Sequence, residues 1–449
     1  MNMMTQAFAR IRPSAAGLIV ASSLILAGWP AQAEVAIQEV KSEKGVTAWL
    51  VEDYSVPIVT IRFSFRSGTT QDPNGKEGLS ELMSGLFDEG AGEFDSDTFQ
   101  TKLDDAGAEM RFGAARDTIF GSMRMLAEKK DEAFALLRLA VEQPRFDAAP
   151  IDRIRAQMVS GIVANQRDPE TAAQVKWAEA LYGTHPYARP DEGTEKSLAT
   201  ITADDLRAYH GRVFARDNLN VAIVGAIDAE TVKRELDRLF GGLPEKSGLQ
   251  PVEQVDLKLG QEVRVDYDLP QTSLQLAYPG VPRDAPDFFP AYLMNHILGG
   301  GTFTSRLFDE VREKRGLAYG VDSSLVTHEY SSGLVISTAT RSDRAAETLA
   351  VIRDAVRKMA EEGPTEAELA AAKKYIVGSY ALNNLDSSNA IAATLLSLQE
   401  EKLGIDYIDR RPALIEAVTL DQVKAAAKKL LTADPAVLVI GPAAEGSKG

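Results

Sequence analysis

The apolar and polar positions of this chain follow two periods: the alternation typical of strands and the spacing of three to four typical of amphipathic helices. Residues 46–65 alternate and are rich in β-branched side chains, which predicts two strands broken near 53–57. Residues 77–88 have their apolar side chains at helical spacing instead. The same criteria predict, in the first half of the chain, strands at 109–126 and 220–224, helices at 95–106, 130–141, 151–164, 169–182 and 228–240, and a helix opening at Thr202.

A second copy of this pattern follows in the second half of the chain. Its predicted elements are strands at 263–266, 273–277 and within 320–340, and helices at 287–298, 345–361 and 366–383. Three pairs of short segments recur in the same order at offsets of 215, 217 and 216 residues: ALLRLAV at 135–141 with AVIRDAV at 350–356, IT at 201–202 with VT at 418–419, and AIVG at 222–225 with LVIG at 438–441. Such offsets indicate two tandem α+β units of about 215 residues.

The two units predict two homologous domains. Residues 241–253 combine glycine, proline and charge, so they are the best candidate for a linker. We place the domains at 34–245 and 246–449. Tandem halves of this kind usually pack face to face, and the cleft at a domain interface is where ligands tend to bind.

Residues 1–33 carry the features of a secretory signal peptide. Arg10 and Arg12 form a positive start, 15–29 is apolar, and Ala31-Gln32-Ala33 matches a small-residue cleavage site. No later segment has about 18 uninterrupted apolar residues, the length that a membrane-spanning helix needs. We therefore expect a soluble protein exported to a bacterial periplasm, with no membrane insertion after the signal is removed.

Composition excludes several functional classes. The chain has no cysteine, which rules out disulfides, thiolate zinc sites, cysteine nucleophiles and a lipidated N-terminal cysteine. Its formal net charge of −16 argues against nucleic acid and anionic membrane surfaces, because both require basic patches. No pair among the four histidines has the i,i+3 or i,i+4 spacing of a helical metal site, and each is interpreted as structural: His185, His210, His296 and His328.

The most informative stretch is LGGGTFTSRLFDEVREKRGLAYG at 298–320. Its three glycines are predicted to make a tight connection outside any regular element, with Thr302 and Thr304 offering hydroxyls for the start of a helix over 305–314. Gly316 is predicted to end that helix, and a strand begins just after it. This order of elements allows Arg312 and Tyr319 to converge.

An arginine fork beside a phenol is suited to gripping a peptide carbonyl or a terminal carboxylate. The alternative is that Arg312 makes a surface ion pair with Glu310 or Glu313 while Tyr319 is half-buried packing, because exposed charges are usually solvated. No nucleophile elbow, phosphate-binding loop or dinucleotide fingerprint occurs in a convincing context, so local motifs indicate no self-contained active site.

Three segments together resemble the insulinase/pitrilysin metallopeptidases and their mitochondrial-processing-peptidase relatives. They are the helix around 78–86, the run from DPETAAQ to NVAIVG at 168–225, and LGGGTFTSRLFDEVREKRGLAYGV at 298–321. The resemblance covers essentially all of the chain after residue 33. It implies two tandem α+β domains, each a mostly antiparallel sheet backed by helices, which face each other across a peptide-binding cleft.

The catalytic half of that family carries an inverted zinc motif, His-x-x-Glu-His, on its first helix, and a further glutamate ligand on a later helix. The resemblance puts Glu81, Ser84 and Gly85 at the three motif positions, and the later glutamate near 160–161, a serine and a glycine. Glycine cannot bind a metal and serine cannot act as the base. The resemblance therefore implies a degenerate zinc motif, with no catalytic residue, no metal and no other cofactor in this chain.

A substitute metal site built from Glu77, Glu81 and Asp88 on one helix face is the alternative, although sets of hard carboxylates suit zinc poorly. The second functional pair of the family is retained. Arg312 and Tyr319 match, at the same spacing, the arginine and tyrosine that bind the substrate backbone near the scissile bond.

The resemblance thus implies a non-catalytic, substrate-binding subunit of an exported heterodimeric peptidase, inactive alone, whose homologous partner holds the zinc. Its substrates would be unfolded peptides that add to a sheet edge, and 111–116 matches the position where the family does this. Gly113 and the two alanines after it also fit ordinary strand packing. The alternatives are a stand-alone zinc peptidase with an unrecognised metal site, a structural assembly protein, and a periplasmic peptide-binding or chaperone module.

Overall fold

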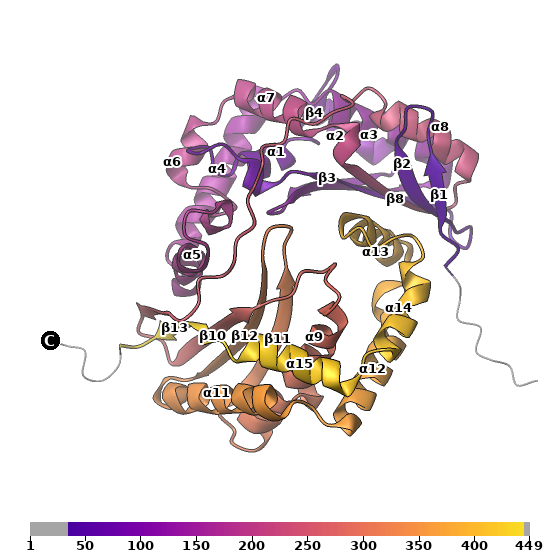
Figure 1. The fold of residues 1–449 in the computed structure, drawn as a ribbon. Helices are drawn as coiled ribbons and strands as arrows, with labels where there is room; N and C mark the ends of the chain where they lie inside the picture. Colours follow the sequence, from indigo (N-terminus) through magenta and orange to yellow (C-terminus); the bar gives the residue numbers. More distant parts are fainter. Residues whose placement is uncertain (1–34, 444–449) are drawn as a thin grey trace, which may run out of the picture. The chain divides into compact units, whose positions relative to one another are not determined.

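Two β-sheets with the same strand order form the framework of the protein (Figure 1). The computed structural model describes residues 35–443. The first sheet contains, in spatial order, β1 (Gln38–Lys41), β2 (Thr47–Glu52), β8 (Leu219–Gly225), β3 (Ile58–Arg66), β7 (Thr118–Leu126) and β6 (Glu109–Ala114). The second contains β9 (Glu262–Asp266), β13 (Ala436–Gly441), β10 (Gln271–Pro279), β12 (Ser332–Arg341) and β11 (Ala318–Thr327).

The two sheets match strand by strand in their pairing. The central strand β3 is antiparallel to β8 and β7, as β10 is to β13 and β12. The one parallel pairing of each sheet joins β2 to β8 in the first and β9 to β13 in the second. β6 and β11 occupy the same outer edge, and β1 is an added strand at the opposite edge of the first sheet. The predicted repetition of a mostly antiparallel α+β unit is therefore confirmed.

Seven helices follow in the same order in both halves, and α8 has no counterpart among the described residues of the second half. The first half has α1 (Leu79–Ser84), α2 (Ser96–Asp105), α3 (Lys130–Glu142), α4 (Ala148–Asn165), α5 (Pro169–Tyr182), α6 (Glu195–Thr200), α7 (Ala203–Val213) and α8 (Ala229–Phe240), and a small ribbon of β4 (Gly90–Ala91) and β5 (Phe94–Asp95). The second half has α9 (Phe288–Asn295), α10 (Arg306–Phe308), α11 (Ala345–Glu362), α12 (Glu366–Asn384), α13 (Ser388–Glu400), α14 (Tyr407–Glu416) and α15 (Leu420–Leu431).

The repeated threonines begin equivalent helices. Thr202 is the N-cap of α7: its hydroxyl accepts the backbone N–H of Asp205 at 3.2 Å, and the Asp205 carboxylate accepts the Thr202 N–H at 2.8 Å. Thr419 and Gln422 form the same reciprocal pair at the start of α15, at 3.3 and 2.8 Å. Such caps typically contribute about 1 kcal/mol each. The capping box predicted at Thr202 is confirmed, and its repetition supports the duplication.

Strand β3 is buried on one face and partly covered on the other. Phe63 and Phe65 have no exposed surface and pack in a cluster of phenylalanines with Phe214 and Phe240. The side chains that alternate with them would face water in a half-covered sheet. Of these, Thr60 and Ser64 are buried as well, because α13 from the second half of the chain packs against β3 and β8, whereas Arg62 is half-buried and Arg66 is exposed.

Each half of the chain supplies one helix that packs against the sheet of the other half: α13 against the first sheet and α5 against the second. Gln399 of α13 bonds the backbone of Val221 in β8: its amide nitrogen donates to the carbonyl oxygen at 2.9 Å, and its amide oxygen accepts the N–H at 3.3 Å. In return, Trp177 on α5 packs in an apolar cluster with Leu438 and Ile440 of β13. This exchange joins the residues from Ile37 onward into one compact unit.

Two predictions about the ends of elements have different outcomes. The glycines at 299–301 were expected outside any regular element, but α9 continues as a π-helical turn over His296–Gly300, so that expectation is wrong for Gly299 and Gly300. The predicted close approach is real: a Cβ on Gly299 would lie 2.5 Å from the hydroxyl of Ser323. The predicted signal peptide at 1–33 lies outside the described residues. Within 35–443, no helix has the length and apolar character needed to cross a membrane.

Candidate functional site

Arg312 and Tyr319 are carried by a short helical segment and the strand that follows it. Ser305 caps α10, its hydroxyl accepting the N–H of Phe308 at 3.4 Å, so the cap falls on Ser305 rather than on the predicted Thr302 or Thr304. The helix continues as a π-helical turn over Asp309–Glu313 that carries Arg312.

Gly316 reverses the chain after this turn. Its φ of +59° is the left-handed conformation that glycine adopts without a steric penalty. The N–H of Gly316 donates to the carbonyl of Arg312 at 2.8 Å, and the N–H of Leu317 donates to the carbonyl of Val311 at 2.9 Å. The predicted helix end is confirmed. The reversal brings Tyr319, at the start of β11, back over Arg312.

The Arg312 guanidinium lies between two aromatic rings. Its Cζ is 4.4 Å from the centre of the Tyr319 ring and 4.8 Å from that of Phe308. Tyr319 is 84% exposed, so its ring and hydroxyl are open to a ligand. Stacking fixes the plane of the guanidinium while its N–H groups at the rim remain free to donate.

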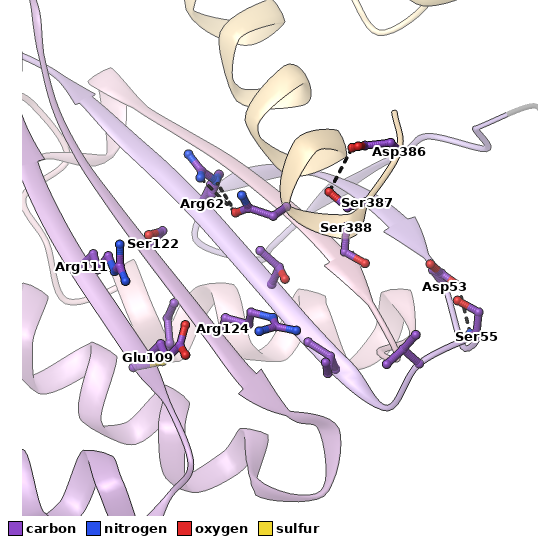
Figure 2. A pocket seen from close by; sticks show the side chains of 15 residues that line it. Asp53, Ser55, Arg62, Glu109, Arg111, Ser122, Arg124, Asp386, Ser387 and Ser388 are labelled. Carbon is purple, nitrogen blue, oxygen red and sulfur yellow. Dashed lines mark hydrogen bonds between the residues drawn. The ribbon is translucent and has the colours of Figure 1, made fainter. Parts of the chain in front are cut away.

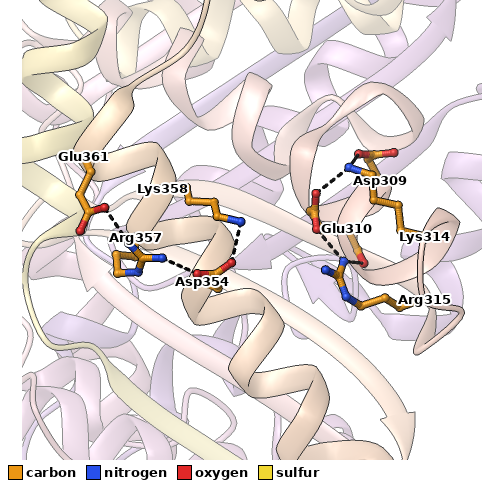
Figure 3. Close-up of polar contacts among 8 residues, drawn as sticks. All are labelled: Asp309, Glu310, Lys314, Arg315, Asp354, Arg357, Lys358 and Glu361. Atoms are coloured by element: carbon orange, nitrogen blue, oxygen red, sulfur yellow. Dashed lines mark hydrogen bonds and ion pairs between the residues drawn. The ribbon is translucent and has the colours of Figure 1, made fainter.

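Of the two predicted ion-pair partners of Arg312, Glu313 is in place and Glu310 is not. Glu310 is held by its neighbours instead: it binds Lys314 at 2.7 Å and Arg315 at 2.5 Å, as Figure 3 shows, and the hydrogen bond from Lys314 lowers the pKa of the Glu310 carboxyl. Only Glu313 is near Arg312, with 3.7 Å between its carboxylate and Nε. A pair this long on the surface contributes about 0–1 kcal/mol at most.

The degenerate zinc motif lies on α1 in the first half of the chain. The carboxylate of Asp72 accepts the backbone N–H groups of Gly78, Leu79 and Ser80 at 2.9, 3.1 and 3.0 Å, which positions the start of this helix. Ser84 is buried, and its hydroxyl donates to the carbonyl of Glu81 at 2.8 Å. Ser84 therefore acts as a helix residue that satisfies its own turn.

Glu81 is the one titratable side chain at the motif positions. Burial, followed by repulsion from Asp191, raises the pKa of its carboxyl to about 7. Gly85 follows as the C-cap of α1, and a Cβ there would lie 3.2 Å from the Ile154 side chain of α4. The neighbouring helix thus fills the space where a ligand from position 85 would project.

The substitute carboxylate site is not assembled. The helix predicted at 77–88 is only six residues long, Leu79–Ser84, so Glu77 precedes it, Asp88 follows it, and the three carboxylates do not share one helix face. Glu77 is used locally, accepting the N–H of Gly75 at 2.9 Å. No group of three or more His, Cys, Asp or Glu side chains converges anywhere in residues 35–443. The residues present therefore do not fit a zinc ion.

Two of the four histidines have ordinary structural partners. His185 contacts the carbonyl oxygen of Glu253 at 2.9 Å through Nε2 and accepts the Tyr187 N–H at Nδ1 at 3.1 Å. His210 contacts the carbonyl oxygen of Val141 at 2.8 Å. The expectation that these two are satisfied single histidines is confirmed.

The segment at 111–116 forms the end of β6 and the turn after it. β6 is the last strand of its sheet, and among the described residues its outer backbone edge has no hydrogen-bond partner. Gly113 also has a packing role, because a Cβ there would lie 2.5 Å from the ring of Phe120 on β7. Within residues 35–443 the outer edge of β6 is thus unpaired, and the glycine is accounted for by strand packing.

A cavity of about 600 Å³ beside β6 was not predicted from the sequence (Figure 2). Its arginines, Arg62, Arg111 and Arg124, lie on three different strands that only the sheet register brings together. The one local sign of this cavity in the sequence was that each of these arginines stands at a polar position of a predicted strand. The same pattern is typical of a solvated surface.

Comparisons with known proteins agree with this arrangement. Two family models match the chain: "Insulinase (Peptidase family M16)" over residues 48–195 and "Peptidase M16 inactive domain" over residues 200–376. A solved structure titled as a peptidase M16 inactive domain, from Pseudomonas fluorescens, has a TM-score of 0.84 and 31% identity, and the match covers 91% of this chain and 98% of that one.

Two curated relatives carry names of opposite meaning. The "Non-peptidase homolog YmxG" of Helicobacter pylori is 26% identical over 366 residues, which are 80% of this chain and 82% of that protein. The "Uncharacterized zinc protease Mb2805c" of Mycobacterium bovis is 30% identical over 352 residues, 77% of this chain and 79% of that protein. This chain has glutamate, serine and glycine at positions 81, 84 and 85 in place of the zinc motif, which is consistent with the first of these two names.

Proposed function

The chain belongs to the insulinase family of M16 peptidases, and we propose that it is the non-catalytic, substrate-binding subunit of an exported heterodimeric zinc metallopeptidase. In this proposal a homologous partner holds the zinc and carries out the hydrolysis of unfolded peptides. The proposal that the protein is exported rests on the signal-peptide features of residues 1–33.

One observation carries the proposal: this chain has lost one functional constellation of its family and kept the other. The motif positions Glu81, Ser84 and Gly85 offer one carboxylate, a hydroxyl bonded within its own helix and no third ligand. Arg312 and Tyr319, in contrast, lie together, and among residues 35–443 the one carboxylate paired with Arg312 is the exposed Glu313, 3.7 Å from Nε. A structural assembly protein does not require such a pair.

Arg312 would bind the substrate near the scissile bond. A guanidinium over the Tyr319 ring, with Cζ 4.4 Å from the ring centre, can donate two parallel N–H groups to a peptide carbonyl or a carboxylate, and the phenol adds a third donor. Because donors aimed at developing negative charge lower the barrier for acyl transfer, this pair would assist an attack that occurs in the partner.

The free edge of β6 would hold an extended part of the peptide. Strand addition supplies backbone hydrogen bonds without selecting the sequence, which suits unfolded substrates. Side chains of the peptide would then alternate between the two faces of the sheet.

Reconstitution tests the proposal. The purified chain, with or without zinc, should hydrolyse no peptide, and mixing it with a homologue that carries His-x-x-Glu-His should give activity that saturates at a one-to-one ratio. Zinc-dependent turnover by the chain alone, with stoichiometric bound metal, would instead identify a stand-alone peptidase. A partner that is fully active alone and indifferent to this chain would refute the split site.

A further inference from the structure

The cavity beside β6 is lined by the exposed face of three adjacent strands and by the start of α13 (Figure 2). Two cross-strand rows make up the sheet face. In the first row, Arg111 of β6 pairs with Ser122 of β7, which pairs with Arg62 of β3. The second row contains Glu109, Arg124 and Thr60 in the same strand order. We call the space above these rows the arginine cavity.

The guanidinium groups of this cavity are not neutralised by ion pairs. Arg62 donates to the amide oxygen of Asn389 at 2.9 and 3.2 Å rather than to a carboxylate. Arg111 and Arg124 are exposed, and among residues 35–443 neither has a side-chain hydrogen bond or an ion pair, although Glu109 stands opposite Arg124 in register. In a chain with a net charge of −16, such a concentration of unpaired positive charge favours an anionic group.

Negative side chains at the other end limit what can bind. Figure 2 shows Asp53 and Asp386 near the turn before β3 and the start of α13, away from Arg111. These carboxylates repel a polyanion that fills the whole cavity. The charge pattern therefore suits a ligand with a single acidic group near Arg111.

The free edge of β6 supplies a way to present that group. A peptide strand paired with β6 extends both rows by one residue, since residues directly opposite each other in a sheet have Cβ atoms about 4.5–5.5 Å apart. The residue opposite Arg111 then lies beside this guanidinium, with Glu109 as its diagonal neighbour on β6, while the residue opposite Glu109 meets a carboxylate directly.

We propose that the arginine cavity is a specificity subsite that selects an acidic side chain, Asp or Glu, at the peptide position opposite Arg111. This inference rests on the proposed peptide-binding role of the β6 edge. The peptide residue two positions away, opposite Glu109, is neutral or basic for the same electrostatic reason. The subunit thus selects among unfolded peptides by the charge of one side chain.

Peptide binding to the full chain tests this selection. The probes are fluorescein-labelled decapeptides of Ser, Thr and Val in which a single Glu, Gln or Lys is placed at each position in turn, and Kd is measured by anisotropy at low salt. When the varied residue lies opposite Arg111, the Glu peptide should bind about 1.4- to 5-fold more tightly than the Gln peptide. The Lys peptide should bind more weakly than the Gln peptide by a similar factor. The preference should shrink as ionic strength rises.

Charge reversal identifies the residue responsible. Arg111→Glu should invert the preference to Lys, and Arg111→Gln should abolish it without inverting it, which separates loss of the site from loss of folding. The matched control is Arg234→Glu on α8, an exposed arginine whose partners are the carbonyl of Glu230 and the hydroxyl of Thr231. It makes the same change in net charge and should leave the preference intact.

The possible failures can be told apart. If the peptides bind with no charge preference, or if Arg111→Glu and Arg234→Glu shift it equally, the subsite is refuted and the proposed function stands. If no peptide, neutral ones included, binds either the chain or the reconstituted pair, the peptide-binding function itself is refuted.

Discussion

Replacing Arg312 with alanine should lower turnover of the reconstituted peptidase by more than it lowers the stability of the chain. The guanidinium contacts the rings of Phe308 and Tyr319, and its nearest carboxylate, on Glu313, is 3.7 Å from Nε. Each cation–π contact at an exposed site contributes about 0.5–1 kcal/mol, and the ion pair contributes about 0–1 kcal/mol. These contacts limit the loss of unfolding free energy to about 1–3 kcal/mol.

The expected loss of turnover is larger. Removing one donor that binds developing charge typically lowers the rate by about 10²–10³, or roughly 3–4 kcal/mol. Arg312→Lys should recover little of it, because an ammonium cannot reproduce the planar two-pronged donor. Tyr319→Phe keeps the stacked ring and removes only the hydroxyl, so it should lower turnover with no measurable change in stability.

The assay combines steady-state cleavage of a quenched peptide by the reconstituted pair with urea unfolding of each variant chain. Arg315→Ala is the matched control: Arg315 follows the same helical turn, but it pairs with Glu310 (Figure 3). It should leave turnover unchanged. Unchanged turnover in a folded Arg312→Ala complex, or an equal loss in Arg315→Ala, would show that Arg312 is only a surface contact.

Three further outcomes follow from the packing and the titration of named residues. Gly299→Ala should lower the unfolding free energy, measured in urea, by about 1–3 kcal/mol, because its Cβ would lie 2.5 Å from Ser323 Oγ. Gly161→Ala on α4 is the control: no atom lies within 4 Å of the new Cβ, so this change should raise the unfolding free energy by about 0.5–1 kcal/mol. The pKa of Glu81 is raised from 4.5 to about 7, so the folded chain retains a proton that the unfolded chain releases, and the unfolding free energy should fall as pH rises from about 4.5 through 7. Glu81→Gln should reduce this fall in a pH series of urea titrations without abolishing it, because burial also raises the pKa of Asp72 to about 7; an unchanged slope would contradict the assignment. Dialysis against EDTA should leave the Tm of the purified chain unchanged, since no metal-binding group of side chains converges in residues 35–443; a lower Tm would revive the stand-alone metal site.

Features that depend on neighbouring residues could be predicted from the sequence. The cap at Thr202 and the helix end at Gly316 rest on contacts within a few residues, and the duplication rests on short segments that recur along the chain; all three are present in the structure. The degenerate zinc motif is of the same kind, because the missing ligands are a matter of residue identity. The helix at 77–88 was overestimated for a local reason too: apolar periodicity continued past Ser84, where the regular helix ends.

Only the tertiary structure decided the features that depend on which segments meet. Helix α13 was not predicted, and nothing in its own sequence indicates that it covers β3 and β8 of the other half while α5 covers β13 in return. The arginine cavity follows from this packing and from sheet register, which is set by long-range pairing rather than by local preference. The pKa of Glu81 is likewise raised by burial, and then by repulsion from acidic residues far away in the sequence, such as Asp191. Periodicity and caps determine elements within a few turns, whereas burial, register and electrostatic fields exist only once those elements have packed together.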